Sequence, residues 1–122
     1  SFVANFIGDA NIVKAKIINK EDNCYQIQLG EIEITLTSNF NLQNYASVAI
    51  RSEAIKIEHE KKSNSIAAKI IKASYVGNNY QYTVSSSLGE LYFVSEDVVN
   101  QYEPGSEIYL TFKKYGLSIL SD

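Results

Sequence analysis

The stretch YQIQLGEIEITLT (residues 25–37) decides how this sequence folds. Apolar residues alternate with polar ones on both sides of Gly30, and this period of two is typical of strands with one buried face. A glycine between the two runs tolerates the positive φ that a tight turn requires. The stretch therefore predicts two strands, residues 25–29 and 31–37, joined by a short turn.

The same alternation recurs along the chain, with β-branched and aromatic residues at every second position. The breaks contain Gly, Asn and Pro104, which favour turns. Only residues 39–45 and 95–103 are predicted to be helical, as short connectors, the second with Ser95 as its N-cap. The sequence thus predicts an all-β barrel or sandwich. Its further strands are residues 12–18, 46–52, 54–58, 66–75, 80–85, 89–95 and 107–112.

A weak repeat relates the two halves of the chain, about residues 12–58 and 66–120. In each half a strand, a hairpin and a later strand follow in the same order. Halves of this size are marginal as independent domains, so we expect them to share a core. The repeat predicts two interleaved five-stranded barrels. Val13, Ala15, Ile17 and Tyr25 in the first half align with Ala67, Lys69, Ile71 and Tyr82 in the second.

Composition narrows the class of protein. With 122 residues, a net charge of -3 and a pI near 5.2, the chain has the size of one domain and no general basic field to attract nucleic acid. Neither a signal peptide nor an apolar run long enough to cross a bilayer occurs, so no membrane insertion is expected. The single Cys24, expected to be half-buried, cannot form an internal disulfide and favours a reducing compartment such as the cytoplasm.

No catalytic constellation can be nominated. The sequence contains no phosphate-binding GxxxxGK[ST] or GxGxxG loop. His59 is the only histidine and lies in a charged run, IEHEKKS, where a solvated loop residue is expected. The carboxylates alternate with apolar residues or lie in turns, and Cys24 has no partner for a zinc site. The nine tyrosines are expected to pack in cores and interfaces rather than stack on bases.

Five segments, in this order, resemble the C-terminal TOBE region, the transport-associated OB-fold module, of bacterial ABC importer ATPases. They are FVANFIGDAN (2–11), VAIRSEAIKI (48–57), ASYVGNNYQYTV (73–84), LGELYFV (88–94) and PGSEIYLTF (104–112), and they span essentially the whole chain. Ser52 stands where the family usually has proline. The positions that match the family's motifs are Phe6, Ile7, Gly8, Asp9, Asn11, Arg51, Glu53 and Gly77.

The resemblance implies that residues 1–11 are a connector from a preceding ATPase domain and that residues 12–122 form the TOBE, OB-like domain. The chain would be a regulatory and dimerisation domain of an importer, most similar to ferric-iron importers and next to polyamine, sulfate or sugar importers. ATP and Mg²⁺ would bind in the missing nucleotide-binding domain, with no catalytic, cofactor or metal residue here. The partners implied are a second copy and membrane permease subunits, at the cytoplasmic face of the inner membrane.

Part of the dimer or regulatory contact is assigned to an aromatic group in the second half. Its members are Tyr75, Val76, Tyr80, Tyr92 and Phe93. The alternative use of these residues is to fill the barrels. The alternative function is a free-standing OB-like module that binds a small anion or single-stranded nucleic acid. The net negative charge of the chain disfavours nucleic acid.

Overall fold

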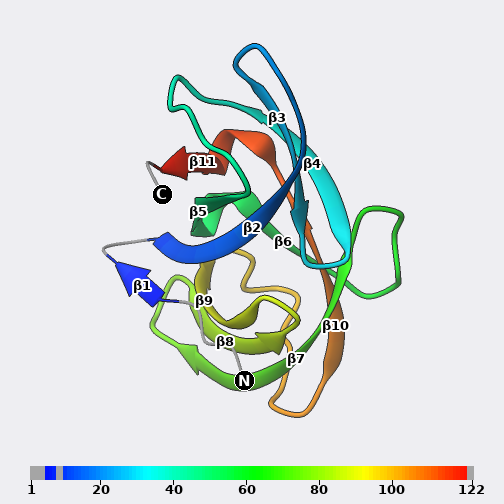
Figure 1. Cartoon of the computed structure of the whole chain (residues 1–122). Helices are drawn as coiled ribbons and strands as arrows, with labels where there is room; N and C mark the ends of the chain where they lie inside the picture. The colour runs from blue at the N-terminus through cyan, green and yellow to red at the C-terminus, as the bar shows by residue number, and fades with distance from the viewer. Residues whose placement is uncertain (1–4, 8–9, 121–122) are drawn as a thin grey trace.

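The computed structural model describes residues 5–7 and 10–120, which form two curled antiparallel sheets (Figure 1). The first sheet has the order β11-β5-β2-β3-β4, with β1 paired to the start of β2, and the second has the order β6-β10-β7-β8-β9. The strands of the first sheet are β1 (Asn5–Ile7), β2 (Ala10–Glu21), β3 (Cys24–Leu29), β4 (Ile32–Thr37), β5 (Tyr45–Arg51) and β11 (Leu117–Leu120). Those of the second are β6 (Ile55–Glu58), β7 (Ile66–Tyr75), β8 (Tyr80–Ser86), β9 (Gly89–Ser95) and β10 (Glu107–Phe112).

The predicted all-β class and the interleaving of two five-stranded units are confirmed. β6 comes from the first half of the chain but pairs with β10 of the second sheet. β11 comes from the end of the chain but pairs with β5 of the first sheet. Each half therefore completes its sheet with a strand from the other half, as the small size of the halves requires.

The hairpin of residues 25–37 anchors the core. Leu29 pairs with Ile32 across a two-residue turn in which Gly30 has a φ of 63°. Alternate side chains of both strands point inward, as their period predicts, and join a single core made by both sheets. In this hairpin the buried residues are Tyr25, Ile27, Leu29, Ile32, Ile34 and Leu36.

The two predicted connecting helices are not at the predicted places. Residues 39–44 and 96–103 contain no helix, and the helical turns are η1 (Ser52–Ala54) and η2 (Lys114–Gly116), both 3₁₀. Asp97 does accept hydrogen bonds from the backbone N–H groups of Val99 and Asn100, but in an isolated turn. Side-chain acceptors serve turns and helix N-termini alike, which explains the wrong helix prediction.

The predicted alignment of the two halves is wrong by one residue in β7. The buried residues there are Ile66, Ala68 and Ile70, whereas Ile71 is 40% exposed. Strands β2 and β7 each contain a shift of register, after Ile17 and after Ile70 respectively. The two shifts occur at equivalent points in the pairing of each strand with the strand that follows it. Ile70 is therefore the counterpart of Ile17. The Tyr25 and Tyr82 match is confirmed, because both are fully buried.

The chain crosses between the sheets at η1 and η2, which pack against each other. Lys113 N–H, just before η2, donates a hydrogen bond of 2.8 Å to the carbonyl of Ala54 in η1. Gly116 lies so close that a Cβ built on it would be 2.5 Å from the Ala54 Cβ and 2.8 Å from its backbone nitrogen. The crossover thus depends on a residue without a side chain.

Two polar side chains tie the edge strand β9 to the first sheet. Asn11, 1% exposed, donates from Nδ2 to the Tyr92 carbonyl at 2.8 Å and accepts from Tyr92 N–H at Oδ1 at 2.9 Å. Ser52 Oγ accepts a hydrogen bond of 3.0 Å from Val94 N–H. These bonds satisfy backbone groups of an edge strand that would otherwise be unpaired. None of the helices among the described residues is long and apolar enough to cross a membrane.

Candidate functional site

The predicted contact residues lie at different depths. Tyr75 and Val76, at the β7–β8 turn, are 57% and 47% exposed. Tyr80 and Tyr92 are half-buried, and Phe93 is buried in the core. The Tyr75 hydroxyl donates to the carbonyl of Gly77, a bond that holds the turn. Of these five residues, only Tyr75 and Val76 in the turn are exposed to solvent, and the use of the turn as a contact stays a prediction.

A row of aromatic rings connects this turn with the opposite loop. Tyr75 contacts Tyr80 at 5.1 Å between ring centroids, and Tyr80 stacks on Tyr82 at 5.7 Å. Tyr82 meets Tyr102 edge-on at 6.1 Å, and Tyr102 meets His59 at 5.3 Å. Aromatic pairs at these distances stabilise each other beyond simple burial. The row runs through the second barrel, from the β7–β8 turn to the loop of residues 96–106.

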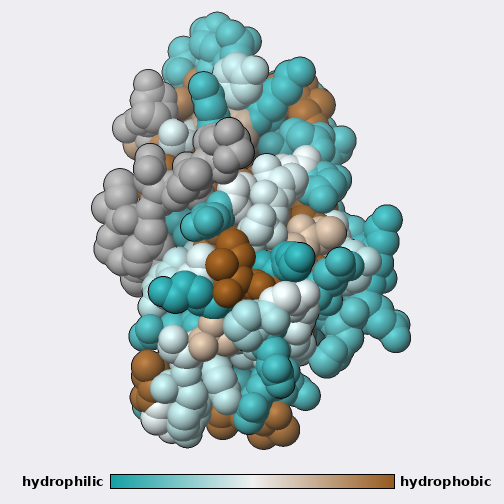
Figure 2. All heavy atoms as spheres, turned by 90° about the horizontal axis from the view of Figure 1, so that it is seen from below, coloured by the Kyte–Doolittle hydropathy of each residue, from teal (hydrophilic) through white to brown (hydrophobic). Residues whose placement is uncertain are grey.

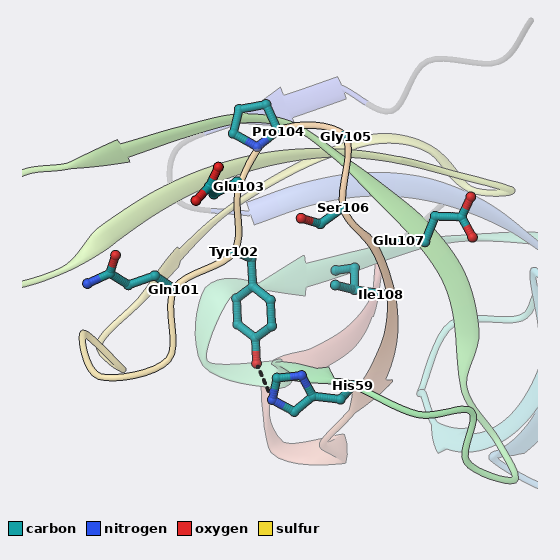
Figure 3. Close-up of a pocket in the computed structure, with 9 residues that line it drawn as sticks. All are labelled: His59, Gln101, Tyr102, Glu103, Pro104, Gly105, Ser106, Glu107 and Ile108. Atoms are coloured by element: carbon teal, nitrogen blue, oxygen red, sulfur yellow. Dashed lines mark hydrogen bonds between the residues drawn. The ribbon is translucent and has the colours of Figure 1, made fainter.

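A shallow depression of about 620 Å³ lies beside Tyr102 (Figure 3). The Tyr102 hydroxyl and His59 Nε2 are 3.3 Å apart, and His59 is exposed, as predicted for a solvated loop residue. The remaining lining residues come from the β9–β10 loop and the start of β10 and include Glu103 and Glu107. Nowhere in residues 5–7 and 10–120 do three His, Cys, Asp or Glu side chains gather as a metal site.

A smaller cleft of about 220 Å³, also lined by Tyr102, lies between β6 and β9. Apolar side chains of Ile55, Ile57 and Phe93 form its floor, and Ser95, Asp97, Lys56 and Lys113 line it as well. Charges of both signs therefore surround this cleft. Tyr102 lines both hollows.

Tyr25 and Tyr82 occupy equivalent positions but differ in hydrogen bonding. The Tyr25 hydroxyl donates to the Phe40 carbonyl at 2.6 Å and accepts from Leu42 N–H at 3.0 Å. The Tyr82 hydroxyl is buried and has no hydrogen-bond partner of normal geometry among the described residues. Burial raises the pKa of Tyr82, and the nearby backbone of Tyr102 only partly offsets this effect.

The two hydroxyls give a matched pair of substitutions. We expect Tyr25→Phe to lower the melting temperature by roughly 5–10 °C, because it leaves the Leu42 N–H and Phe40 carbonyl without partners. Tyr82→Phe removes an unpartnered hydroxyl and is expected to leave the melting temperature within about 2 °C or to raise it. Differential scanning calorimetry measures both. If both variants lose the same number of degrees in melting temperature, the difference in hydrogen bonding between the two hydroxyls is refuted.

The buried phenols also predict weaker stability at alkaline pH. Burial raises the pKa of Tyr82 and of Tyr102, and the Asp97 charge raises both further. A group with a raised pKa in the folded state loses its contribution as pH rises above about 10, the value in the unfolded chain. Tyr25 acts in the opposite direction, because the Leu42 N–H lowers its pKa. The urea midpoint at pH 11 should be lower than at pH 8, and Tyr82→Phe/Tyr102→Phe should reduce the difference. If the urea midpoint of the double variant falls as much between pH 8 and pH 11 as that of the parent chain, these two phenols are not the cause of the alkaline destabilisation.

The family-motif positions lie mostly at the junction of the sheets. The backbone of Phe6 and Ile7 belongs to β1, whereas Gly8 and Asp9 fall outside the described residues. Arg51 ends β5 and Glu53 lies in η1, both exposed. Away from the junction, Gly77 has a φ of 95° in the β7–β8 turn.

Cys24 is exposed rather than half-buried, because as the first residue of β3 its side chain points away from the core, opposite to its neighbour Tyr25. Tyr102 was not predicted as part of any site, since its segment had been interpreted as a short helix. Its only sequence signal is an aromatic residue two positions before Pro104, which is weak.

The face of the molecule that carries β7 and β8 has no large apolar patch. Figure 2 shows this face from below, with hydrophobic residues in small separate groups within a largely hydrophilic surface. Large exposed apolar patches are the usual mark of permanent interfaces. The exposed side chains at the β7–β8 turn are thus a local feature of this face.

Several known proteins are similar to this chain in sequence. A "Fe(3+) ions import ATP-binding protein FbpC" of Rhizobium etli is 24% identical over 99% of this chain, and this match covers 34% of that protein. The protein of the same name in Agrobacterium fabrum is 24% identical over 98% of the chain, covering 34% of its length. The one in Escherichia coli O157:H7 is 27% identical over 99% of the chain, covering 33% of its length. The chain thus spans about a third of these curated relatives.

A solved structure supports the fold. The cytoplasmic molybdate-binding protein ModG, in a form with molybdate bound, superposes with a TM-score of 0.68 over 93% of this chain and 96% of that chain, at 11% identity. The profile of the TOBE domain matches residues 48–120, which include strands of both sheets. By this match and by its fold, the chain belongs to the TOBE domain family.

Proposed function

We propose that this chain is the regulatory domain of the ATP-hydrolysing subunit of an ABC importer, and that the importer carries ferric iron. The observation that carries the proposal is the match over nearly the whole chain to ferric-ion import ATP-binding proteins of several bacteria. Residues 1–11 would connect this domain to the ATPase domain. Polyamine, sulfate and sugar importers remain the alternative transporters.

ATP hydrolysis would take place elsewhere in the parent protein. The sequence has no phosphate-binding loop, and the only helices among the described residues are two single turns. Neither provides the helix N-terminus that commonly cradles phosphate groups. We therefore assign ATP and Mg²⁺ to the ATPase domain of the parent protein, and regulation and assembly to this chain.

The coding region before Ser1 tests the placement in a larger ATPase. We expect it to encode a P-loop and an ABC signature that run directly into FVANFIG. A start codon at or just before Ser1 would instead leave a free-standing β module.

The domain is further proposed to hold two ATPase subunits together while their catalytic domains separate. Such a contact keeps the local concentration of the partner high after hydrolysis. The exposed side chains of Tyr75 and Val76 are the proposed centre of the contact, with Tyr80 packed beneath them. Phe93 supports this region from the core.

Light scattering at high micromolar concentration tests this contact. The chain should be a dimer, and Val76→Asp should shift it to monomer because a charge is costly in an apolar contact. Val99→Asp is the matched control, since Val99 is 84% exposed on another loop. A parent chain that stays monomeric argues against dimerisation by this domain alone. A dimeric Val76→Asp variant would move the contact elsewhere.

A small-anion sensor is the alternative function, and ModG shows that a protein of this fold takes molybdate. The depression beside Tyr102 speaks against it, because Glu103 and Glu107 line it, and in the smaller cleft Asp97 stands beside Lys56 and Lys113. We expect molybdate and sulfate to leave the melting temperature unchanged. A ligand at a hundred times its Kd would stabilise the fold by about 2.7 kcal/mol, which a thermal shift would detect.

A further inference from the structure

The first sheet curls so far that its two end strands come near each other without pairing. The sheet has the order β11-β5-β2-β3-β4, so β4 and β11 each keep one edge that no described strand pairs with. The two strands nevertheless lie close together. A groove of about 620 Å³ lies between them, and we call it the first seam. Backbone N–H and C=O groups along such edges can bond to an added strand.

The second barrel has an equivalent seam between β6 and β9, the cleft of about 220 Å³ that Tyr102 lines. Leu36, in the first seam, is the hairpin partner of Tyr25. Phe93, in the second seam, is the hairpin partner of Tyr82. The repeat has thus formed the same apolar seam twice. Two aliphatic residues of the strand opposite complete each floor, Leu117 and Ile119 in the first seam and Ile55 and Ile57 in the second.

The second seam contains an aromatic side chain from the protein's own loop. Tyr102, in the β9–β10 loop, is half-buried, packs against the core and lines this seam. The corresponding loop of the first barrel, residues 38–44, contributes none of the described residues that line the first seam. Its Leu42, whose N–H bonds to the Tyr25 hydroxyl, has a shorter side chain than Tyr102. The first seam therefore offers the space that an aromatic ring takes up in the second.

The two seams also differ in charge. Lys114 is the only charged residue among the described residues that line the first seam, and no ion pair joins it to another described residue. Its neighbour Tyr115 is 68% exposed and lines the same groove. In the second seam, by contrast, Lys56 and Lys113 stand beside Asp97. A carboxylate is thus the partner that the lysine of the first seam lacks.

We propose that the first seam binds an extended segment of a partner protein that carries an aromatic residue and a carboxylate. The segment pairs with the free edge of β4, its ring covers Leu36 and Ile119, and its carboxylate bonds to Lys114. Because every second side chain of a strand faces the same way, the aromatic and acidic residues are two positions apart. Strand addition takes affinity from main-chain hydrogen bonds and specificity from alternate side chains. This binding role is independent of the proposed transport function.

NMR titration of the ¹⁵N-labelled chain with the blocked peptide acetyl-TVYTETV-amide tests the site. The amides of residues 35–37 and of β11 should shift, while those of β6 in the second seam should not. A peptide with alanine in place of the tyrosine, or with glutamine in place of the glutamate, should bind at least about 5-fold more weakly. Unshifted β4 and β11 amides at about 2 mM peptide would overturn the proposal.

Charge reversal at the seam tests the role of Lys114. Lys114→Glu should weaken binding of the peptide at least about 5-fold, because attraction is replaced by repulsion. Lys72→Glu on β7 is the matched control, since it makes the same change in net charge outside the first seam and should leave the dissociation constant unchanged. Both lysines are exposed, so both variants should fold. Equal weakening by the two variants would overturn the assignment of Lys114.

N-methylated peptides distinguish strand pairing from insertion of the ring alone. Only alternate N–H groups of a strand face the neighbouring edge. Methylation of the tyrosine nitrogen or of the following threonine nitrogen should therefore weaken binding in one case and not in the other. Equal effects would overturn pairing with β4. Shifts of the β4 and β11 amides that depend on protein concentration without peptide would assign the groove to a second copy of this chain, and would also overturn the proposal.

Discussion

Replacing Gly116 with alanine is expected to lower the free energy of unfolding by about 3 kcal/mol, and the melting temperature by roughly 10 °C. The added Cβ would lie 2.5 Å from the Ala54 Cβ, 2.8 Å from its nitrogen and 2.9 Å from its Cα. Two of these atoms belong to backbone that cannot rotate away. Because Lys113 N–H is bonded to the Ala54 carbonyl, relief of the clash would also strain the crossover. Urea denaturation followed by circular dichroism measures the loss.

Gly77→Ala is the matched control for this substitution. Gly77 has a φ of 95° but no atom within 4 Å of the added Cβ, so only backbone strain of about 1–2 kcal/mol is expected. Ala54→Gly in the Gly116→Ala background removes the Cβ–Cβ contact and should restore part of the stability. A Gly116→Ala variant as stable as Gly77→Ala would show that the two crossovers are not in close contact.

Removal of the Asn11 amide is the second large effect. Asn11→Leu keeps a side chain of similar volume but removes the hydrogen bonds that Asn11 makes to the N–H and the carbonyl of Tyr92, at a cost of about 3 kcal/mol. A longer contact, 3.4 Å from Nδ2 to the Ile50 carbonyl, is lost as well. Hydrogen exchange should become faster in β9, because this edge strand then loses its hydrogen bonds to Asn11 and keeps those to β8 and Ser52.

Asn11→Asp separates the hydrogen bonds from simple packing. Its carboxylate can accept from Tyr92 N–H but faces the Tyr92 carbonyl, to which Asn11 donates. Burial and that carbonyl favour the protonated form and raise the pKa of the new carboxyl. Its penalty is therefore largest at neutral pH and shrinks as pH falls toward about 4. Asn39→Asp on the exposed loop is the control. A pH-independent penalty at position 11 would contradict the assigned bonds.

Strong alternation made most of the fold predictable. Every second residue of the 25–37 hairpin is apolar, and each of those residues is buried. In β7, by contrast, Ile66, Ala67, Ala68, Ile70 and Ile71 offer apolar residues in both registers, and the irregularity after Ile70 reverses the faces. The pattern of apolar residues therefore predicts this strand but not which of its two faces is buried.

The sequence pattern does not predict β11, the strand that the second half of the chain contributes to the first sheet in exchange for β6. β11 (Leu117–Leu120) has only four residues and follows a helical turn, so its period of two is too short to be recognised. The close approach of Gly116 to Ala54 is likewise a tertiary contact between residues far apart in the chain. No local propensity encodes such a contact.

The site was predictable only in part. Tyr75 and Val76 were predicted as contact residues and are exposed, but Phe93 shares their apolar character and is buried. Tyr25 and Tyr82 look alike in sequence, and only the path of the loop above each decides whether its hydroxyl is bonded. Long-range hydrogen bonds such as Asn11 to Tyr92 have no signature in a single sequence.

Uptake of radioactive ferric ion by intact cells tests the proposed function most directly. Cells that lack the gene for this chain should lose most of the uptake, and the intact gene should restore it. Asn39→Asp on an exposed loop should restore it fully, whereas Gly116→Ala should restore less because the domain is unstable. Uptake of sulfate and of a polyamine should stay unchanged. Undiminished ferric uptake in cells without the gene would contradict the proposal.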